Sequence, residues 1–125
     1  MPFLRGVVAR TVIDMLLKRA QSANVTIHAY CAMPTHLHFV MTLDGEKRPE
    51  DFLRSSKSGA SHAINRLGVL PRRFSWERSY FDTHAKGSWG QLHQIRYVLM
   101  NPVEAGLCEQ WEQWPCSAWL STPLY

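Results

Sequence analysis

The sequence contains three cysteines, and this small number excludes two kinds of small protein. Cys31, Cys108 and Cys116 are odd in number and irregular in spacing, so we expect neither a disulfide framework nor a zinc ribbon. Thiols without disulfide partners are typical of a reducing compartment. The cysteines therefore predict a cytoplasmic protein.

Long apolar runs are also missing. No stretch approaches the roughly 20 residues of a membrane-spanning helix, and the N-terminus lacks the pattern of a signal peptide with its cleavage site. The sequence has no internal repeat, low-complexity tract, linker or phosphate-binding glycine loop. We expect a soluble protein with no membrane partner, whose chemistry does not use ATP.

The chain does have the composition of one folded domain. An apolar fraction of 46% excludes a disordered chain, and 125 residues most simply form a single domain over 1–125. Lysine and arginine exceed aspartate and glutamate by 14 to 10. This basic excess suits a nucleic-acid partner, although ordinary solubility explains it equally well.

Apolar periodicity predicts the helices. Residues 3–21, 49–67 and 88–101 have apolar side chains at helical spacing. Proline cannot continue a helix interior, so the last helix should stop near Asn101, before Pro102.

Runs of β-branched and aromatic residues predict the strands. Two such runs, 25–32 and 36–43, are close enough to form an antiparallel hairpin, and a third strand falls within 72–82. The tail, 103–125, contains three tryptophans that we expect to pack back on the domain: Trp111, Trp114 and Trp119.

Two histidines lie two residues apart in the strand over 36–43. In an extended strand, side chains at i and i+2 share a face, so His36 and His38 project together. Val40 and Thr42 continue this face. The opposite face would pack in the core and consists of Leu37, Phe39, Met41 and Leu43. Alone, such a pair is weak evidence for a metal site.

A third ligand would strengthen the case. Asn101 follows Tyr97 by four residues, so in a helix the two side chains lie one turn apart on one face. Two imidazoles and an amide oxygen would leave positions on Mg²⁺ or Mn²⁺ for a phosphodiester and water, while Tyr97 attacks the phosphorus. Alternatively, Tyr97 packs as an ordinary helix residue and Asn101 caps the helix.

The other histidines and the cationic residues form weaker patterns. Four further histidines lack ligand spacing to the pair and are assigned structural roles: His28, His62, His84 and His93. Five cations are candidates for DNA contacts: Lys57, Arg72, Arg73, Arg78 and Arg96. The mixture of cations and aromatics within 72–82 suits stacked bases, and it equally suits the edge of a core.

Two of these motifs resemble a known family. Residues 30–40 resemble the histidine motif of HUH single-tyrosine transposases, in particular the REP-associated tyrosine transposases, in which "MPNHVH" is typical. Residues 96–107 resemble their second motif, "YI-x-x-NPV-x-AGL", and 114–119 are similar to the tail motif "YPWSS". Residues 57–65 and 76–81 also resemble the corresponding stretches of this family. The resemblance covers nearly the whole chain in the right order.

The resemblance implies a fold, a reaction and a substrate. The fold would be a ferredoxin-like α+β sandwich with helices on an antiparallel sheet. Mg²⁺ or Mn²⁺ would be bound by His36, His38 and Asn101, and Tyr97 would be the nucleophile. The implied activity is cleavage and strand transfer of single-stranded DNA, often at a hairpin, through a 5′-phosphotyrosine intermediate. The alternative is a catalytically impaired protein that still binds DNA hairpins.

The sequence departs from the family at two places. Thr35 stands where the family usually has Asn. The family's first strand, with its "YHV-x-x-R" pattern, is missing or shortened. Three explanations stay open: residues 1–8 supply a short strand, another protomer of a homodimer donates one, or the reading frame is truncated. The location expected from the family is the cytoplasm, on the nucleoid when DNA is bound.

Overall fold

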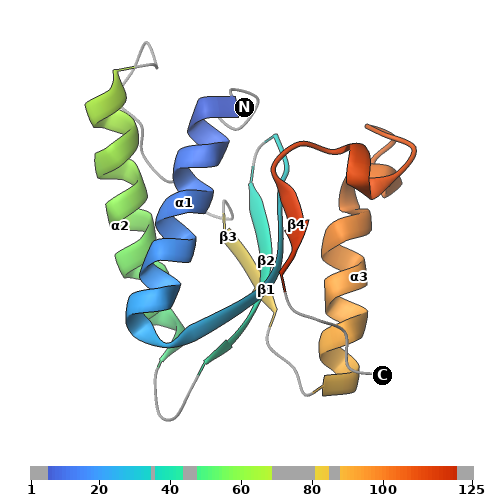
Figure 1. Ribbon diagram of the computed structural model, residues 1–125, viewed down its shortest axis with the longest axis horizontal. Helices are drawn as coiled ribbons and strands as arrows, with labels where there is room; N and C mark the ends of the chain where they lie inside the picture. Colours follow the sequence, from blue (N-terminus) through green and yellow to red (C-terminus); the bar gives the residue numbers. More distant parts are fainter. Residues whose placement is uncertain (1–5, 35, 44–47, 69–80, 85–87, 121–125) are drawn as a thin grey trace.

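In the computed structural model, a four-stranded sheet lies between two layers of helices (Figure 1). The structure describes residues 6–34, 36–43, 48–68, 81–84 and 88–120. The elements in chain order are α1 (Gly6–Ala23), β1 (Val25–Ala32), β2 (Leu37–Leu43), α2 (Pro49–Leu67), β3 (Phe81–His84), α3 (Ser88–Glu104), the 3₁₀ turn η2 (Trp111–Gln113) and β4 (Ser117–Trp119). The predicted α+β arrangement is confirmed. None of the described helices has the length and apolar content needed to cross a membrane.

The sheet has the strand order β3-β2-β1-β4. Strand β1 pairs antiparallel with β2 on one side and with β4 on the other, so the predicted hairpin is confirmed. Strand β3 runs parallel to β2, from which α2 separates it in sequence. Such a parallel neighbour needs a long crossover, which α2 provides. The predicted third strand overlaps β3 at residues 81–82, and residues 72–80 lie outside the described part.

The fourth strand comes from the tail and was not predicted from the sequence. Strand β4 has only three residues and joins the free edge of β1. At the other end of the chain, residues 6–8 already belong to α1. The proposal that 1–8 form a shortened strand is therefore wrong for 6–8, and residues 1–5 lie outside the described part.

A β-bulge in β1 sets which side chains face which helices. The register of β1 against β2 shifts between Ile27 and Ala29, with His28 at the irregularity. An extra residue in one strand reverses the alternation of faces beyond it. Ile27 and Tyr30 consequently share the core under α1 and α2, whereas Ala29 and Cys31 share the core under α3.

Both faces of the sheet are therefore packed. Helices α1 and α2 cover one face and α3 covers the other (Figure 1). The larger core contains Val8, Val12, Ile13, Leu16, Leu37, Phe39, Met41 and Ile64. The smaller core contains Ala29, Cys31, Met33, Val40, Ile95, Val98 and Leu99. The predicted alternation in β2 is confirmed, because its odd-numbered residues pack under α1 and α2.

Helix α3 continues through Pro102 and ends at Glu104, so the predicted stop near Asn101 is wrong. Gly106, with φ of 74°, provides the left-handed residue of a Schellman motif. Its N–H bonds to the carbonyl of Val103 at 2.9 Å, and that of Leu107 bonds to the carbonyl of Pro102 at 2.9 Å. These bonds satisfy the last carbonyls, so the glycine and not the proline ends the helix.

The tail packs against the α3 side of the sheet, as predicted. Trp111, Trp114 and Trp119 contact the smaller core. The indole Nε1 of Trp114 donates to the carbonyl of Ala32 at 2.9 Å, and the N–H of Ala32 donates to the carbonyl of Cys116 at 3.0 Å. The tail is thereby attached to the end of β1.

Candidate active site

A tight turn between β1 and β2 places the first histidine. The N–H of Met33 donates to the carbonyl of His36 at 2.8 Å, and the N–H of His36 donates back to the carbonyl of Met33 at 3.3 Å. This reciprocal pair closes the turn. It fixes the backbone of His36 immediately before β2 begins at Leu37.

The two histidines point at one another, as their spacing predicts. Their Nε2 atoms lie 2.5 Å apart, and their ring centroids are 4.2 Å apart with an angle of 77° between the planes. His38 is 4% exposed and His36 is half-buried. Ring nitrogens this close form a hydrogen bond, in which one Nε2 donates and the other accepts. Both nitrogens thus converge on one point, and a metal ion could replace the shared proton only if the two rings moved apart.

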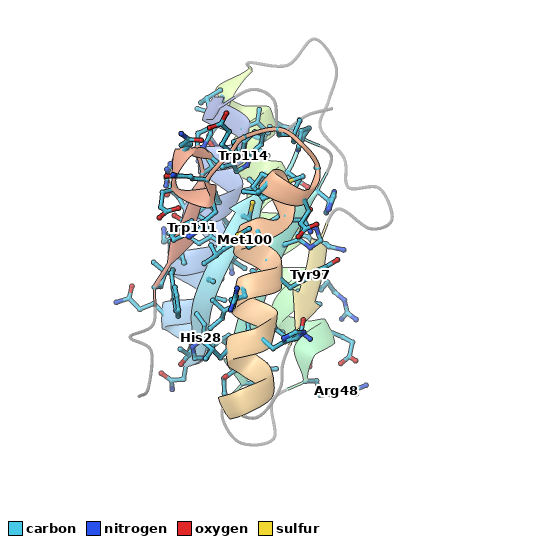
Figure 2. All side chains as sticks on the ribbon, turned by 90° about the vertical axis from the view of Figure 1, so that its right-hand side faces the viewer. His28, Arg48, Tyr97, Met100, Trp111 and Trp114 are labelled. Carbon is cyan, nitrogen blue, oxygen red and sulfur yellow. The ribbon has the colours of Figure 1, made fainter. Side chains whose placement is uncertain are left out.

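Helix α3 brings Tyr97 beside this pair. The rings of Tyr97 and His38 are 6.2 Å apart at an angle of 89°, in an edge-to-face contact. Tyr97 is 52% exposed, so its side chain is open to a large substrate. In Figure 2 it lies on the side of α3 nearer β3, whereas His28 lies on the other side of the helix. Ile95, Val98 and Leu99 anchor α3 through the smaller core.

Asn101 occupies the next turn of the same helix. Because α3 continues past it, Asn101 is inside the helix and is not a C-cap, and it keeps the predicted four-residue spacing from Tyr97. Its backbone carbonyl accepts from the N–H of Ala105 at 3.0 Å. The side chain is half-buried.

The donor set limits which ion would fit. Within the described residues, no group of three or more His, Cys, Asp and Glu side chains could hold a metal. The two imidazoles converge here, and the amide of Asn101 on α3 is the predicted third donor. Imidazole nitrogen suits transition metals better than Mg²⁺, which prefers oxygen. Of the two predicted ions, Mn²⁺ fits these residues better.

Cys31 is a neighbour of the site that the sequence did not indicate. It pairs directly with His38 across the β1–β2 ladder and is fully buried. Burial raises the pKa of its thiol to about 12, so Cys31 stays protonated and packs as an apolar residue. The sequence does not reveal the bulge at His28. A strict alternation of faces along 25–32 would therefore assign Cys31 to the wrong face of the sheet.

The structure separates the candidate DNA-contacting cations. Arg96 is exposed and adjoins Tyr97 on α3. Lys57 lies on α2, on the opposite side of the sheet (Figure 1). Arg72, Arg73 and Arg78 lie outside the described residues. Of the two described cations, Arg96 is therefore the one on the same helix as Tyr97.

Three of the remaining histidines have described side chains, and no contact with the pair is seen for these three. His28 contacts the hydroxyl of Thr42 through Nε2 at 2.8 Å, and burial lowers its pKa. His62 and His93 are exposed on α2 and α3. The side chain of His84 lies outside the described part. His28 thus has a structural contact of its own, as assigned from the sequence.

The exposed Tyr97 and the histidine pair lie at the positions where the sequence motifs resemble those of single-tyrosine transposases. The chain belongs to the family described as "Transposase IS200 like", which it matches over residues 2–99. That match includes both histidines and Tyr97 and ends before Asn101.

A characterised relative supports the same family. The REP-associated tyrosine transposase of Escherichia coli K12 is 27% identical over 103 residues, which are 82% of this chain and 59% of the relative. The chain thus spans about three fifths of that relative's length. No solved structure gives a significant match. The resemblance noted from the motifs is confirmed at the level of the family.

Proposed function

We propose that this protein cleaves and rejoins single-stranded DNA during transposition, with Tyr97 as the nucleophile. His36, His38 and Asn101 would hold one Mn²⁺ or Mg²⁺ ion. The observation that carries the proposal is the position of the Tyr97 ring, 6.2 Å from that of His38, whose Nε2 converges with that of His36. Membership of a transposase family supports DNA as the substrate.

The reaction follows from the residues at this site. The phenolic oxygen of Tyr97 attacks the phosphorus of a phosphodiester, and the bond from phosphorus to the 3′ oxygen breaks. The phenol loses its proton to solvent, and the departing 3′ oxygen takes one up. Tyr97 then carries the 5′-phosphate of one fragment, and the other fragment ends in a free 3′-hydroxyl. A bound divalent ion would polarise the phosphate and offset the charge that develops on it.

The second half of the reaction needs no nucleotide cofactor. The tyrosine ester retains much of the free energy of the cleaved bond, so a 3′-hydroxyl can attack it and restore a phosphodiester. Attack by the original end reverses cleavage, and attack by a different end transfers the strand. Exposure of Tyr97 is compatible with exchange of these ends.

We infer the finer substrate and setting from the family resemblance. The substrate would be a hairpin-forming strand that is cut beside the hairpin, with Arg96 next to Tyr97 contacting its backbone. The active site is built within one chain or across a homodimer. The protein would act in the cytoplasm, on the nucleoid when bound to DNA.

The test is capture of the covalent intermediate. A labelled single-stranded hairpin with Mn²⁺ should give a denaturation-resistant protein–DNA adduct in the wild type and none in Tyr97→Phe. Tyr30→Phe is the matched control, because Tyr30 is buried under α1 and α2 and should keep the adduct. An adduct of equal yield in Tyr97→Phe would refute the assignment.

The second candidate function is DNA-hairpin binding without cleavage. Membership of the family supports DNA binding without requiring that cleavage takes place. Hairpin binding in a gel shift, with no adduct under any divalent metal, would support this alternative. Binding that does not change with salt would argue against both functions.

A further inference from the structure

A cavity of about 310 Å³ lies at the end of the sheet opposite the histidine pair. Val25 and Leu43, which line it, form the last pair of the β1–β2 ladder, and Ala32 and Leu37 form the pair at the other end. The cavity opens between the end of α1 and the start of α2. It is thus separate from the site that contains Tyr97.

The floor of this cavity is apolar. Phe52 and Val25 line it and are 6% and 7% exposed, respectively, and Leu43 is half-buried beside them. These three side chains belong to or pack against the larger core, so the floor is fixed by the fold. A fixed apolar floor suits the flat, weakly polar part of a ligand.

The rim of the cavity is polar and mainly cationic. Arg19 and Arg48 both line it, and Nη1 of Arg19 donates to the hydroxyl of Ser55 at 3.1 Å. This bond holds the Arg19 guanidinium across the opening from α1 to α2. Ser22 also lines the rim, where its hydroxyl donates to the carbonyl of Lys18 at 3.3 Å. The two guanidinium groups suit the oxygens of an anion such as a phosphate.

The described carboxylates nearby are few. Asp51 is the acidic residue among the described lining residues, and its Oδ1 lies 3.9 Å from the guanidinium of Arg54. Glu50 lies 3.7 Å from Arg48. Both pairs are largely exposed and contribute little. Among the described residues, the lining therefore has two arginines and one carboxylate.

We propose that this cavity binds one nucleotide of the DNA strand. The phosphate would contact Arg19 and Arg48, and the base or sugar would lie on the floor formed by Phe52, Val25 and Leu43. The cavity volume lies within the range of about 300–1,000 Å³ that is usual for small-ligand sites. The identity of the ligand rests on the proposed function, because that function makes DNA the substrate.

The site would position the strand and take no part in the chemistry. It lies at the opposite end of the β1–β2 ladder from His36, and its residues come from the face under α1 and α2, whereas Tyr97 is on α3. A contact so placed orients DNA relative to the protein, as phosphate contacts generally do.

The first part of the test measures how much the charges of the two arginines contribute to DNA binding. Binding of a fluorescent single-stranded oligonucleotide is titrated at several salt concentrations in the Tyr97→Phe background, which separates binding from cleavage. Adding Arg19→Ala and Arg48→Ala together should weaken binding about tenfold or more and reduce the salt slope by about 0.7, the value for one phosphate on a single strand. Arg66→Ala is the control, because Arg66 is exposed in the last turn of α2, away from the cavity.

The second part tests whether DNA binding needs the open space of the cavity. Ser22→Leu should fill part of the cavity without changing charge and without offering a ring on which a base can stack, and we expect binding about fivefold weaker with an unchanged salt slope. Gln21→Leu is the matched control, because Gln21 is also exposed in α1 but does not line the cavity. The thermal unfolding midpoint of each variant confirms that it is folded.

The outcomes separate this inference from the proposed function. If the oligonucleotide binds but neither the arginine pair nor Ser22→Leu weakens its binding relative to the controls, the cavity inference is overturned and the proposed function stands. If both weaken binding but the wild type forms no adduct, the inference holds and cleavage is rejected. Absence of all oligonucleotide binding would overturn both.

Discussion

The rings of Tyr97 and His38 pack edge to face, with their centroids 6.2 Å apart and an angle of 89° between their planes. This separation is within the range of favourable aromatic pairs, which contribute about 0.5–1.5 kcal/mol. The contact joins α3 to β2, the two elements that carry the candidate nucleophile and the histidine pair. It fixes the direction of a side chain that is still 52% exposed.

Metal binding to the histidine pair should stabilise the protein. A ligand that binds only the folded state adds about 2.7 kcal/mol at 100 times its Kd. We expect Mn²⁺ to raise the thermal midpoint of the wild type, Mg²⁺ to raise it less, and His36→Ala to show no increase with either ion. Differential scanning fluorimetry measures these shifts. His93→Ala is the control, because His93 is exposed on α3, and a Mn²⁺ shift retained in His36→Ala would contradict the assignment.

Acid should destabilise the protein through His28. Burial lowers its pKa in the folded state, so the unfolded chain, with a pKa of about 6.5, binds this proton more readily. The stability that depends on neutral His28 is complete above about pH 6.5 and is lost as the pH falls toward the lowered pKa. The thermal midpoint should therefore fall less between about pH 7.5 and about pH 5.5 in His28→Gln than in the wild type. The exposed His93→Gln should follow the wild type, and equal falls in all three proteins would exclude His28 as the cause.

Local patterns in the sequence were sufficient to predict most elements. Strand β1 runs over the predicted 25–32, where β-branched and aromatic residues are frequent. Helix α2 runs over the predicted 49–67, because a proline marks its start and Gly68 its end. The i, i+2 and i, i+4 spacings also placed His36 with His38 and Tyr97 with Asn101. These relations depend only on the geometry of one strand and one helix.

The errors came from features that depend on distant parts of the chain. Strand β4 has three residues and forms only because the tail returns to the edge of β1, which no local pattern shows. The parallel pairing of β3 with β2 depends on the crossover through α2. For α3, Gly106 would have located the true end of the helix, but Pro102 was given too much weight. A proline near a helix end removes one hydrogen bond, and here the later carbonyls have other partners.

Gly59 allows α1 and α2 to approach closely. A Cβ added there would lie 2.9 Å from the sulfur of Met15 and 3.1 Å from Nη2 of Arg19. Gly59→Ala should gain about 1 kcal/mol of helix propensity, but the side chains of Met15 and Arg19 must shift to admit the methyl group, so we expect a net change near zero. In a Met15→Ala background, the same change should stabilise the protein because the nearest neighbour is gone. Urea unfolding of the four proteins measures this, and equal effects of Gly59→Ala in both backgrounds would exclude crowding by Met15.

Trp114 should support the site from the tail. Its indole N–H donates to the carbonyl of Ala32 at 2.9 Å, and Ala32 immediately precedes the turn that carries His36. Trp114→Phe keeps an aromatic ring but removes the donor, so we expect a loss of about 1–2 kcal/mol in the free energy of unfolding. The change should also reduce the Mn²⁺-dependent rise in thermal midpoint, because the turn is less firmly held.

The matched control for this change is Trp111→Phe, since Trp111 packs against the same smaller core. Both substitutions remove similar apolar area, but only the one at Trp114 removes the bond to Ala32. Urea unfolding should therefore show a larger loss for Trp114→Phe, and the Mn²⁺ shift should stay near the wild-type value in Trp111→Phe. If the two variants lose equal stability and keep equal Mn²⁺ shifts, the tail stabilises the domain by packing alone and does not help to place His36.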